Sequence, residues 1–262
     1  MPILRGGRLL KRWRYVGAFG RDLMLCAGLA RIGPTIQSWW AIWDRESCCL
    51  RERTRPGHGG VRFARGRARV DDEDVRIDLE WTEAPGIEVV TPDGGGYAWT
   101  RKQGGVAVSG SVGVDGKTRA FEACAVIDDS AGYHARRSAW RWSAGVGTVT
   151  DGRPVAWNLV AGVHDDARAS ERTVWVGGQA DEVGPVRFIG ELDGIALAQA
   201  GATGGDASAL SFSAEATRER HDNFLLFRSD YVQPFGTFSG FLPGAGELSE
   251  GYGVMERHEV LW

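Results

Sequence analysis

The sequence predicts an all-β protein, a sandwich or a barrel, and three observations support this fold class. Short runs of alternating apolar and polar residues follow one another along the chain, with turn-forming residues about every eight to twelve positions. The 38 Gly suit many tight turns, and the 11 Trp suit the walls of a large core. Convincing helical periodicity is almost absent. About sixteen or seventeen candidate strands result, which favours two barrel-like antiparallel halves.

The first expected half covers residues 13–127 and follows a basic stretch at residues 1–12. That stretch could bind phosphates, but we interpret it as a solvated leader. The acidic run from Asp71 to Asp74 is interpreted as a solvated turn, because it lacks the ligand spacing of a calcium loop. The expected strands of this half lie at residues 13–30 (with a helix as the alternative), 36–43, 61–70, 75–81, 87–91, 97–101, 106–114 and 119–127.

The second expected half covers residues 128–262 and begins with the stretch richest in chemically active side chains, Ile127 to Gly162. Tight Gly-rich turns separate the segments that follow it. The expected strands after this stretch lie at residues 173–177, 186–191, 195–200, 209–216, 223–229, 236–242 and 251–262. An antiparallel barrel of this kind can enclose one small ligand, so its interior is the natural place for a site.

Charge and composition exclude several classes of function. A formal net charge of -3 gives no global attraction to nucleic acid or to an anionic membrane. No apolar stretch is long enough to span a bilayer, and Arg21 and Asp22 interrupt the one candidate secretory signal, so we expect a cytoplasmic protein. The four Cys show neither a disulfide framework nor zinc-type spacing, and we expect reduced thiols.

Familiar motifs of cofactor and metal chemistry are absent. There is no Walker loop, GxSxG elbow, HExxH or GxGxxG that opens a helix. The five His show no i,i+4 or HxH spacing, so a metal site would have to be assembled in space. We therefore predict no cofactor and no metal site.

A set of ligand-binding candidates follows from strand alternation in the central stretch. His134, Arg136, Trp140 and Trp142 fall on one face of an extended segment. If this face points into a cavity, the guanidinium and the indoles could hold an amphipathic ligand. If it points outward, the same residues form a stacked surface ladder of Arg and Trp.

Two further residues complete the expected ligand-binding set. Asn158 lies among apolar neighbours, so its amide is either part of a ligand site or part of a structural hydrogen-bond network. Trp175 follows in a short apolar segment and is included as another aromatic wall residue.

Candidate acids occur at two places. Glu256 and His258 share a strand face with apolar residues, and burial there would raise the pKa of Glu256 and make it a possible proton donor. An internal hydrogen-bonded pair that closes the last strand is the alternative. Asp128 and Asp129 precede the central stretch and point to opposite sides of an extended chain, so at most one can enter a pocket; capping of a turn is their alternative role.

The sequence resembles a bacterial family of domains of unknown function, number 2804, over nearly the whole chain from about Trp13. The segments that carry the resemblance are RWRYVGAFGRDL (Arg12 to Leu23), GYHARRSAWRWSAGVGTVTDGRPVAWNLVAG (Gly132 to Gly162), VWVGG (Val174 to Gly178), QPFGTFSGFL (Gln233 to Leu242) and GVMERHEVLW (Gly253 to Trp262). One departure is Glu171-Arg172, where members of the family tend to have Glu-Asn.

More remotely, the chain is similar to the lipocalin-like, two-barrel group of carotenoid hydratases and tocopherol cyclase-like proteins. That similarity implies a small lipophilic, polyketide- or isoprenoid-like partner. Two hypotheses follow: cofactor-independent acid-base hydration, cyclisation or isomerisation of such a ligand, or a carrier that binds it without catalysis. A structural or interaction module without an enclosed cavity is a third.

Overall fold

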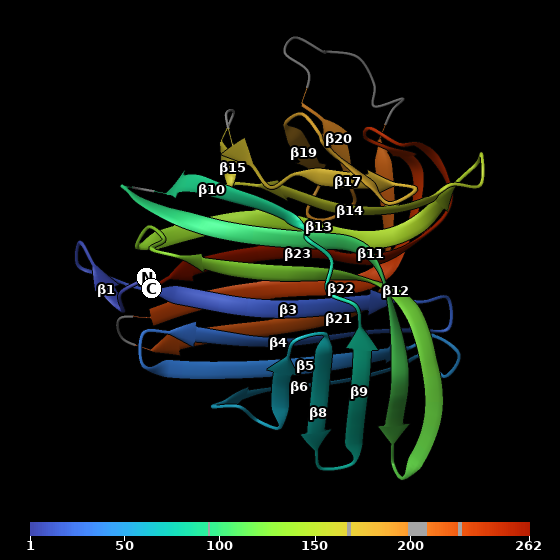
Figure 1. Ribbon diagram of the computed structural model, residues 1–262, viewed down its shortest axis with the longest axis horizontal. Coiled ribbons are helices and arrows are strands. Elements are labelled where there is room, and N and C mark those ends of the chain that lie inside the picture. The colour runs from blue at the N-terminus through green and yellow to red at the C-terminus, as the bar shows by residue number, and fades with distance from the viewer. Residues whose placement is uncertain (94, 167–168, 199–208, 225–226) are drawn as a thin grey trace.

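The computed structural model describes residues 1–93, 95–166, 169–198, 209–224 and 227–262 (Figure 1). All regular secondary structure in these residues is β, which confirms the predicted fold class. Two large antiparallel sheets follow one another along the chain, and the first ends at Gly132 while the second begins at Arg137. Residues 199–200 and 225–226 of the expected strands lie outside the described residues.

The first sheet curls over itself, so that its two ends cross (Figure 1). Its strands, in the order in which they pair, are β6 (Cys49–Pro56), β5 (Thr35–Asp44), β4 (Leu23–Ile32), β3 (Lys11–Phe19), β12 (Lys117–Gly132), β11 (Gly96–Val114), β9 (Val75–Trp81), β8 (Arg67–Asp72) and β7 (Val61–Ala64), with β10 (Ile87–Asp93) also paired to β11.

The second sheet has nine strands among the described residues. They are, in pairing order, β18 (Gln179–Glu182), β17 (Thr173–Val176), β14 (Pro154–Ala161), β13 (Arg137–Val149), β23 (Gly246–Leu261), β22 (Phe227–Leu242), β21 (Leu210–Phe224), β20 (Gly194–Leu197) and β19 (Val186–Ile189). Two small hairpins accompany the sheets, β1 (Leu4–Arg5) with β2 (Arg8–Leu9) and β15 (Asp165–Asp166) with β16 (Ala169–Ser170).

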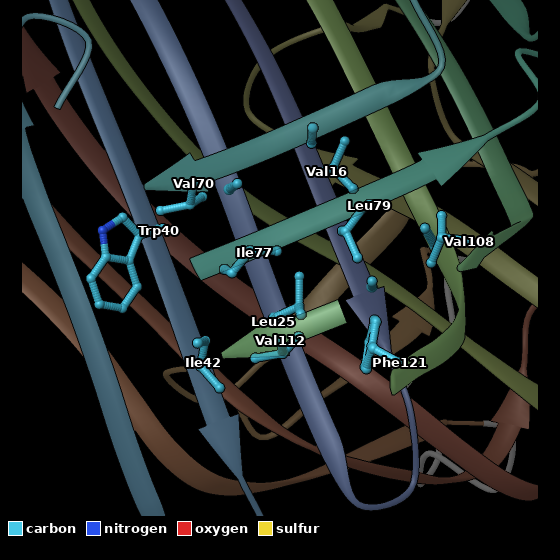
Figure 2. Close-up of a cluster of buried hydrophobic side chains, with 14 of the residues drawn as sticks. Val16, Leu25, Trp40, Ile42, Val70, Ile77, Leu79, Val108, Val112 and Phe121 are labelled. Atoms are coloured by element: carbon cyan, nitrogen blue, oxygen red, sulfur yellow. The ribbon is translucent and has the colours of Figure 1, made fainter. Parts of the chain in front are cut away.

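Each sheet encloses an apolar core of its own, and a third core joins the two sheets. In the first sheet, Val70, Ile77 and Leu79 on crossing strands cover Val16 and Leu25 (Figure 2). The second sheet closes around a cluster that includes Trp157 and Phe238. The joining core takes side chains from both sheets, among them Met24, Trp43, Trp142, Trp175 and Phe235.

Two local expectations are corrected by this fold. The single strand expected at residues 13–30 is the hairpin of β3 and β4, which turns at residues 20–22. The acidic run is not a solvated turn throughout, because Asp72 ends β8 and is only 7% exposed. Its carboxylate accepts a hydrogen bond from Trp40 Nε1 at 2.9 Å and from Arg55 Nη2 at 3.1 Å, which compensates the burial of its charge.

Candidate functional site

A cavity of about 480 Å³ is lined by both sheets. Strand alternation directs polar and aromatic side chains into it from β3, β11 and β12 on one side and from β13, β22 and β23 on the other. Its described lining includes the tryptophans Trp13, Trp39, Trp140, Trp142 and Trp262. The cavity therefore combines a mainly aromatic wall with a few ionisable groups.

Glu256 is the ionisable group at the β23 wall. Trp140 Nε1 donates a hydrogen bond to Glu256 Oε1 at 2.7 Å, and Gln233 Nε2 donates to Oε2 at 2.9 Å. Burial raises the pKa of Glu256 to about 7, against the lowering by the hydrogen bonds from Trp140 and Tyr231. Near neutral pH the side chain is therefore divided between its acid and its carboxylate forms.

Arg218 lines the cavity beside Glu256 and Tyr231. Its side chain is 3% exposed and donates to Glu52 Oε2 at 2.8 Å and to Gln233 Oε1 at 3.0 Å. A third hydrogen bond reaches the Tyr231 hydroxyl at 3.3 Å. These bonds fix Gln233 so that its amide NH₂ faces Glu256.

His258 lies two residues beyond Glu256 on the same strand face and lines the cavity. Its Nε2 and the Ser229 hydroxyl are 2.8 Å apart, and its ring lies 4.4 Å from the Trp140 ring. Burial lowers the pKa of His258 to about 4, so the ring is neutral at physiological pH. Trp140 lies between the two side chains: it packs against His258 and donates a hydrogen bond to Glu256.

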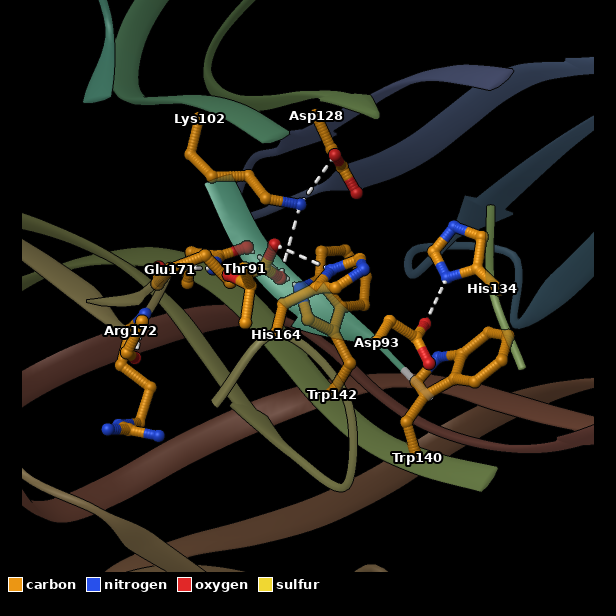
Figure 3. A network of polar contacts seen from close by, with 12 residues as sticks. Thr91, Asp93, Lys102, Asp128, His134, Trp140, Trp142, His164, Glu171 and Arg172 are labelled. Carbon is orange, nitrogen blue, oxygen red and sulfur yellow. Dashed lines mark hydrogen bonds and ion pairs between the residues drawn. The ribbon is translucent and has the colours of Figure 1, made fainter. Parts of the chain in front are cut away.

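A second ionisable cluster, around Lys102, reaches the cavity from the first sheet (Figure 3). Lys102 on β11 and Asp128 on β12 are direct cross-strand partners, with Nζ 2.5 Å from Oδ1. Glu171 lies 3.3 Å from the same ammonium. Burial disfavours the ammonium, but the two carboxylates outweigh it and raise the pKa of Lys102. The cluster is a buried, charge-compensated group.

Two histidines extend this cluster along the cavity. His164 Nδ1 lies 3.0 Å from Glu171 Oε2, and His134 Nδ1 lies 2.8 Å from Asp93 Oδ2 (Figure 3). Trp13 stacks on the His134 ring with 5.2 Å between the ring centroids. In the described part of the chain, Nε2 of each histidine is buried without a hydrogen-bond partner.

Six of the ten expected site residues line one cavity: His134, Trp140, Trp142, Asp128, Glu256 and His258. The other four lie elsewhere. Asp129 points to the opposite face of β12, where Arg14 Nη1 is 3.6 Å away. Arg136 is exposed ahead of β13, because the strand begins only at Arg137.

Asn158 and Trp175 form supporting layers outside the cavity lining. Asn158 accepts a hydrogen bond from Trp142 Nε1 at 2.8 Å and donates one to the Glu171 carbonyl at 2.8 Å. These bonds place its amide in a hydrogen-bond network that positions Trp142. Trp175 packs over Gly104 in the joining core. Both belong to the expected ligand-binding set, and neither is among the residues that line this cavity.

Sequence reasoning missed Lys102, Glu171, Arg218, Gln233 and Tyr231 as site residues. One signal was present: the chain has 31 Lys and Arg residues, of which only Lys11, Lys102 and Lys117 are lysines. Lys11 and Lys102 are both buried. Lys117, at the start of β12, is exposed, so the rarity of lysine alone does not single out the buried Lys102.

The fold and the cavity define the class: an all-β, lipocalin-like protein with an aromatic cavity that holds a buried acid. The chain belongs to the family described as Domain of unknown function (DUF2804), which matches residues 51–262. No curated protein matches the sequence significantly. No helix among the described residues is long and apolar enough to cross a membrane.

Several solved structures match this chain, and two of them show the shared fold. Kievitone hydratase from Nectria haematococca superposes with a TM-score of 0.59 at 12% identity, over 96% of this chain and 88% of that chain. A Nitrosomonas europaea protein provisionally assigned as AttH gives 0.53 at 13% identity, over 94% of this chain and 91% of that chain. Identities this low establish the common fold and nothing further.

Proposed function

We propose that this protein is a cofactor-independent acid-base enzyme that acts on a small apolar or amphipathic molecule, with Glu256 as its general acid. One observation carries the proposal. A buried carboxyl at the cavity wall has a pKa of about 7, and a general acid works best when its pKa lies near the operating pH. The fold shared with a hydratase supports a role of this class.

The chemistry proposed is proton transfer to a carbon-carbon double bond. Glu256 gives its proton to one alkene carbon, and the positive charge that develops on the other carbon is stabilised by the faces of Trp140 and Trp142. Addition of water gives an alcohol, loss of a neighbouring proton gives an isomer, and attack by an internal nucleophile gives a ring. In each case the proton released returns to the Glu256 carboxylate.

The residues around Glu256 take supporting roles in this proposal. Trp140 and Gln233 orient the carboxyl through their hydrogen bonds. His258, held by Ser229, packs against the Trp140 ring at a tilt of 59° and fixes the indole. Asp128 is the second candidate acid: burial raises its pKa, and the neighbouring Lys102 ammonium opposes that rise.

Substitution Glu256→Gln tests the proposal. Purified protein would be incubated with alkenyl phenols and linear isoprenoid alkenes, and the products followed by mass spectrometry. Gain of the mass of water reports hydration, whereas a new species of unchanged mass reports isomerisation or cyclisation. We expect Glu256→Gln to lose at least about 100-fold in turnover. Binding of the apolar dye N-phenyl-1-naphthylamine, measured by fluorescence, should change by no more than about threefold, since the aromatic walls remain.

Glu259→Gln is the matched control, because Glu259 is an exposed carboxylate on the same strand. It should leave both turnover and dye binding unchanged. Undiminished turnover in Glu256→Gln would remove Glu256 from the mechanism.

A carrier is the second candidate, favoured by the five tryptophans of the described lining. Such a protein needs the indole walls and no acid. It predicts tight dye binding in both the native protein and Glu256→Gln, with no conversion of any compound tested. Saturable turnover by the native protein excludes it.

A further inference from the structure

Three side chains that the proposed mechanism does not use meet at the far end of the cavity. Asp93 ends β10, His134 lies between β12 and β13, and His164 follows β14. One potential ligand atom from each lies within 4.8 Å of those from the other two. Asp93 Oδ2 and His134 Nδ1 are 2.8 Å apart, a hydrogen-bond distance, so an ion that binds both atoms requires the tautomer of His134 with its proton on Nε2.

His164 presents a free nitrogen to this group. Its Nδ1 is held by Glu171 Oε2 at 3.0 Å, which leaves Nε2 as the atom it can offer. That Nε2 is buried and has no partner among the described residues. A carboxylate on one nitrogen of an imidazole, with the other nitrogen free, is the arrangement that orients metal-binding histidines.

The surrounding charges balance one another. The carboxylates of Asp93, Asp128 and Glu171 are equal in number to the cationic groups of Arg8, Lys11 and Lys102 in this part of the molecule. Lys102 is already paired with two of these carboxylates, so its charge is compensated before an ion arrives. Two imidazoles and a carboxylate are donors that Zn²⁺ and similar divalent ions prefer.

We propose that Asp93, His134 and His164 bind a divalent first-row transition-metal ion such as Zn²⁺, with Glu171 holding the His164 ring in place. Three protein ligands leave at least one coordination position open. His134 and His164 line the cavity, so this position faces a bound ligand and could take one of its oxygen atoms. The site goes beyond the acid-base function and does not depend on it.

Metal binding to the purified protein tests the proposal directly. Protein dialysed against a chelator would be titrated with Zn²⁺ in equilibrium dialysis and with Co²⁺ by visible absorption. We expect saturable binding of one equivalent. His164→Gln and Asp93→Asn should each weaken it by at least about 100-fold. Glu171→Gln, which removes only the orienting carboxylate, should weaken it by about 10- to 100-fold.

His221→Ala is the matched control. This imidazole also faces a carboxylate, with Nδ1 3.5 Å from Asp230 Oδ1, but its side chain is 62% exposed and lies outside the cavity lining. The variant should bind Zn²⁺ as the native protein does. Circular dichroism and thermal melting of each isosteric variant distinguish loss of the site from loss of the fold.

Two results would overturn the proposal. One is the absence of saturable binding by the folded native protein. The other is binding that survives in His164→Gln and Asp93→Asn but disappears when the surface thiols Cys48 and Cys49 are replaced by Ser, which would place the ion on those thiols. Glu256→Gln should retain full Zn²⁺ affinity, so failure of the acid-base proposal and failure of the metal site are separate outcomes.

Discussion

At the scale of single residues, the pKa of Glu256 is raised by burial more than it is lowered by the contacts that stabilise its carboxylate. Hydrogen bonds from Trp140 and Tyr231 and the charge of Arg218 all stabilise the carboxylate. Burial nevertheless determines the outcome, and the pKa rises from its usual 4.5 to about 7. Because the donors come from β13 and β22, the proton affinity of this acid depends on the packing of three neighbouring strands.

This pKa shift predicts how stability depends on pH. Below the usual pKa of 4.5 the carboxyl is protonated in both the folded and the unfolded state, and the shift has no effect. Between 4.5 and about 7 only the folded state holds the proton, so the free energy of unfolding falls as pH rises. Above that range the folded state carries a buried carboxylate, and the free energy of unfolding is about 3 kcal/mol lower than it is below pH 4.5.

The Glu256→Gln variant lacks this titration. Relative to the native protein, its free energy of unfolding should therefore rise by about 3 kcal/mol on going from about pH 4 to about pH 8. Urea unfolding of both proteins at the two pH values measures the change. A difference between them that does not vary with pH would show that the carboxyl titrates normally in the fold.

At the scale of elements, glycines inside strands make room for tryptophans on the neighbouring element. The three pairs are Gly28 with Trp39, Gly104 with Trp175 and Gly145 with Trp157. A Cβ at any of these glycines would lie 2.2 Å from a ring atom of its tryptophan. Glycine weakens a strand locally, but its missing side chain lets the large ring pack flat over the backbone.

Gly145→Ala tests this packing on β13. Its tryptophan partner is fully buried and donates through Nε1 to the Ser143 hydroxyl at 3.0 Å, so the ring has little freedom to move. We expect the free energy of unfolding to fall by about 1–3 kcal/mol, measured by urea denaturation. Gly184→Ala, at a position with open space, should change it by no more than about 0.5 kcal/mol. Equal effects of the two changes would contradict the steric explanation.

At the scale of the whole molecule, the two sheets share the core in which Trp43 and Met24 of the first pack with Trp142 and Phe235 of the second. Polar contacts cross between the sheets as well, including Arg218 to Glu52 at 2.8 Å and Trp43 Nε1 to Glu215 at 2.8 Å. Separation of the halves would expose apolar surface and leave a buried guanidinium unpaired.

We therefore expect the two halves to unfold together. Tryptophan fluorescence and far-UV circular dichroism should follow one coincident urea transition. Residues 137–262 expressed alone should lack a cooperative transition, because the shared core would be open to water. Two separated transitions in the full chain would show that the halves are independent domains.

Site residues could be predicted from the sequence where several of them lie on one strand. Alternation alone placed Glu256 and His258 on one face, and Trp140 and Trp142 on another, and all four line the cavity. Arg136 is exposed ahead of β13, and the sequence did not show that this strand begins only at Arg137. Asn158 alternates correctly, yet the Glu171 loop covers it.

By itself the sequence determined the all-β class and the faces of individual strands, since side-chain alternation and turn chemistry depend on residues close along the chain. Only the tertiary structure decided which strands pair and in which register. Lys102 meets Asp128 through the pairing of β11 with β12. Asp93 meets His134 through the pairing of β10, β11 and β12, and His164 joins them from the segment after β14, which leaves no spacing pattern in the sequence. Burial is likewise a property of the assembled sheets, so the pKa of Glu256 follows from the fold and not from its neighbours in sequence.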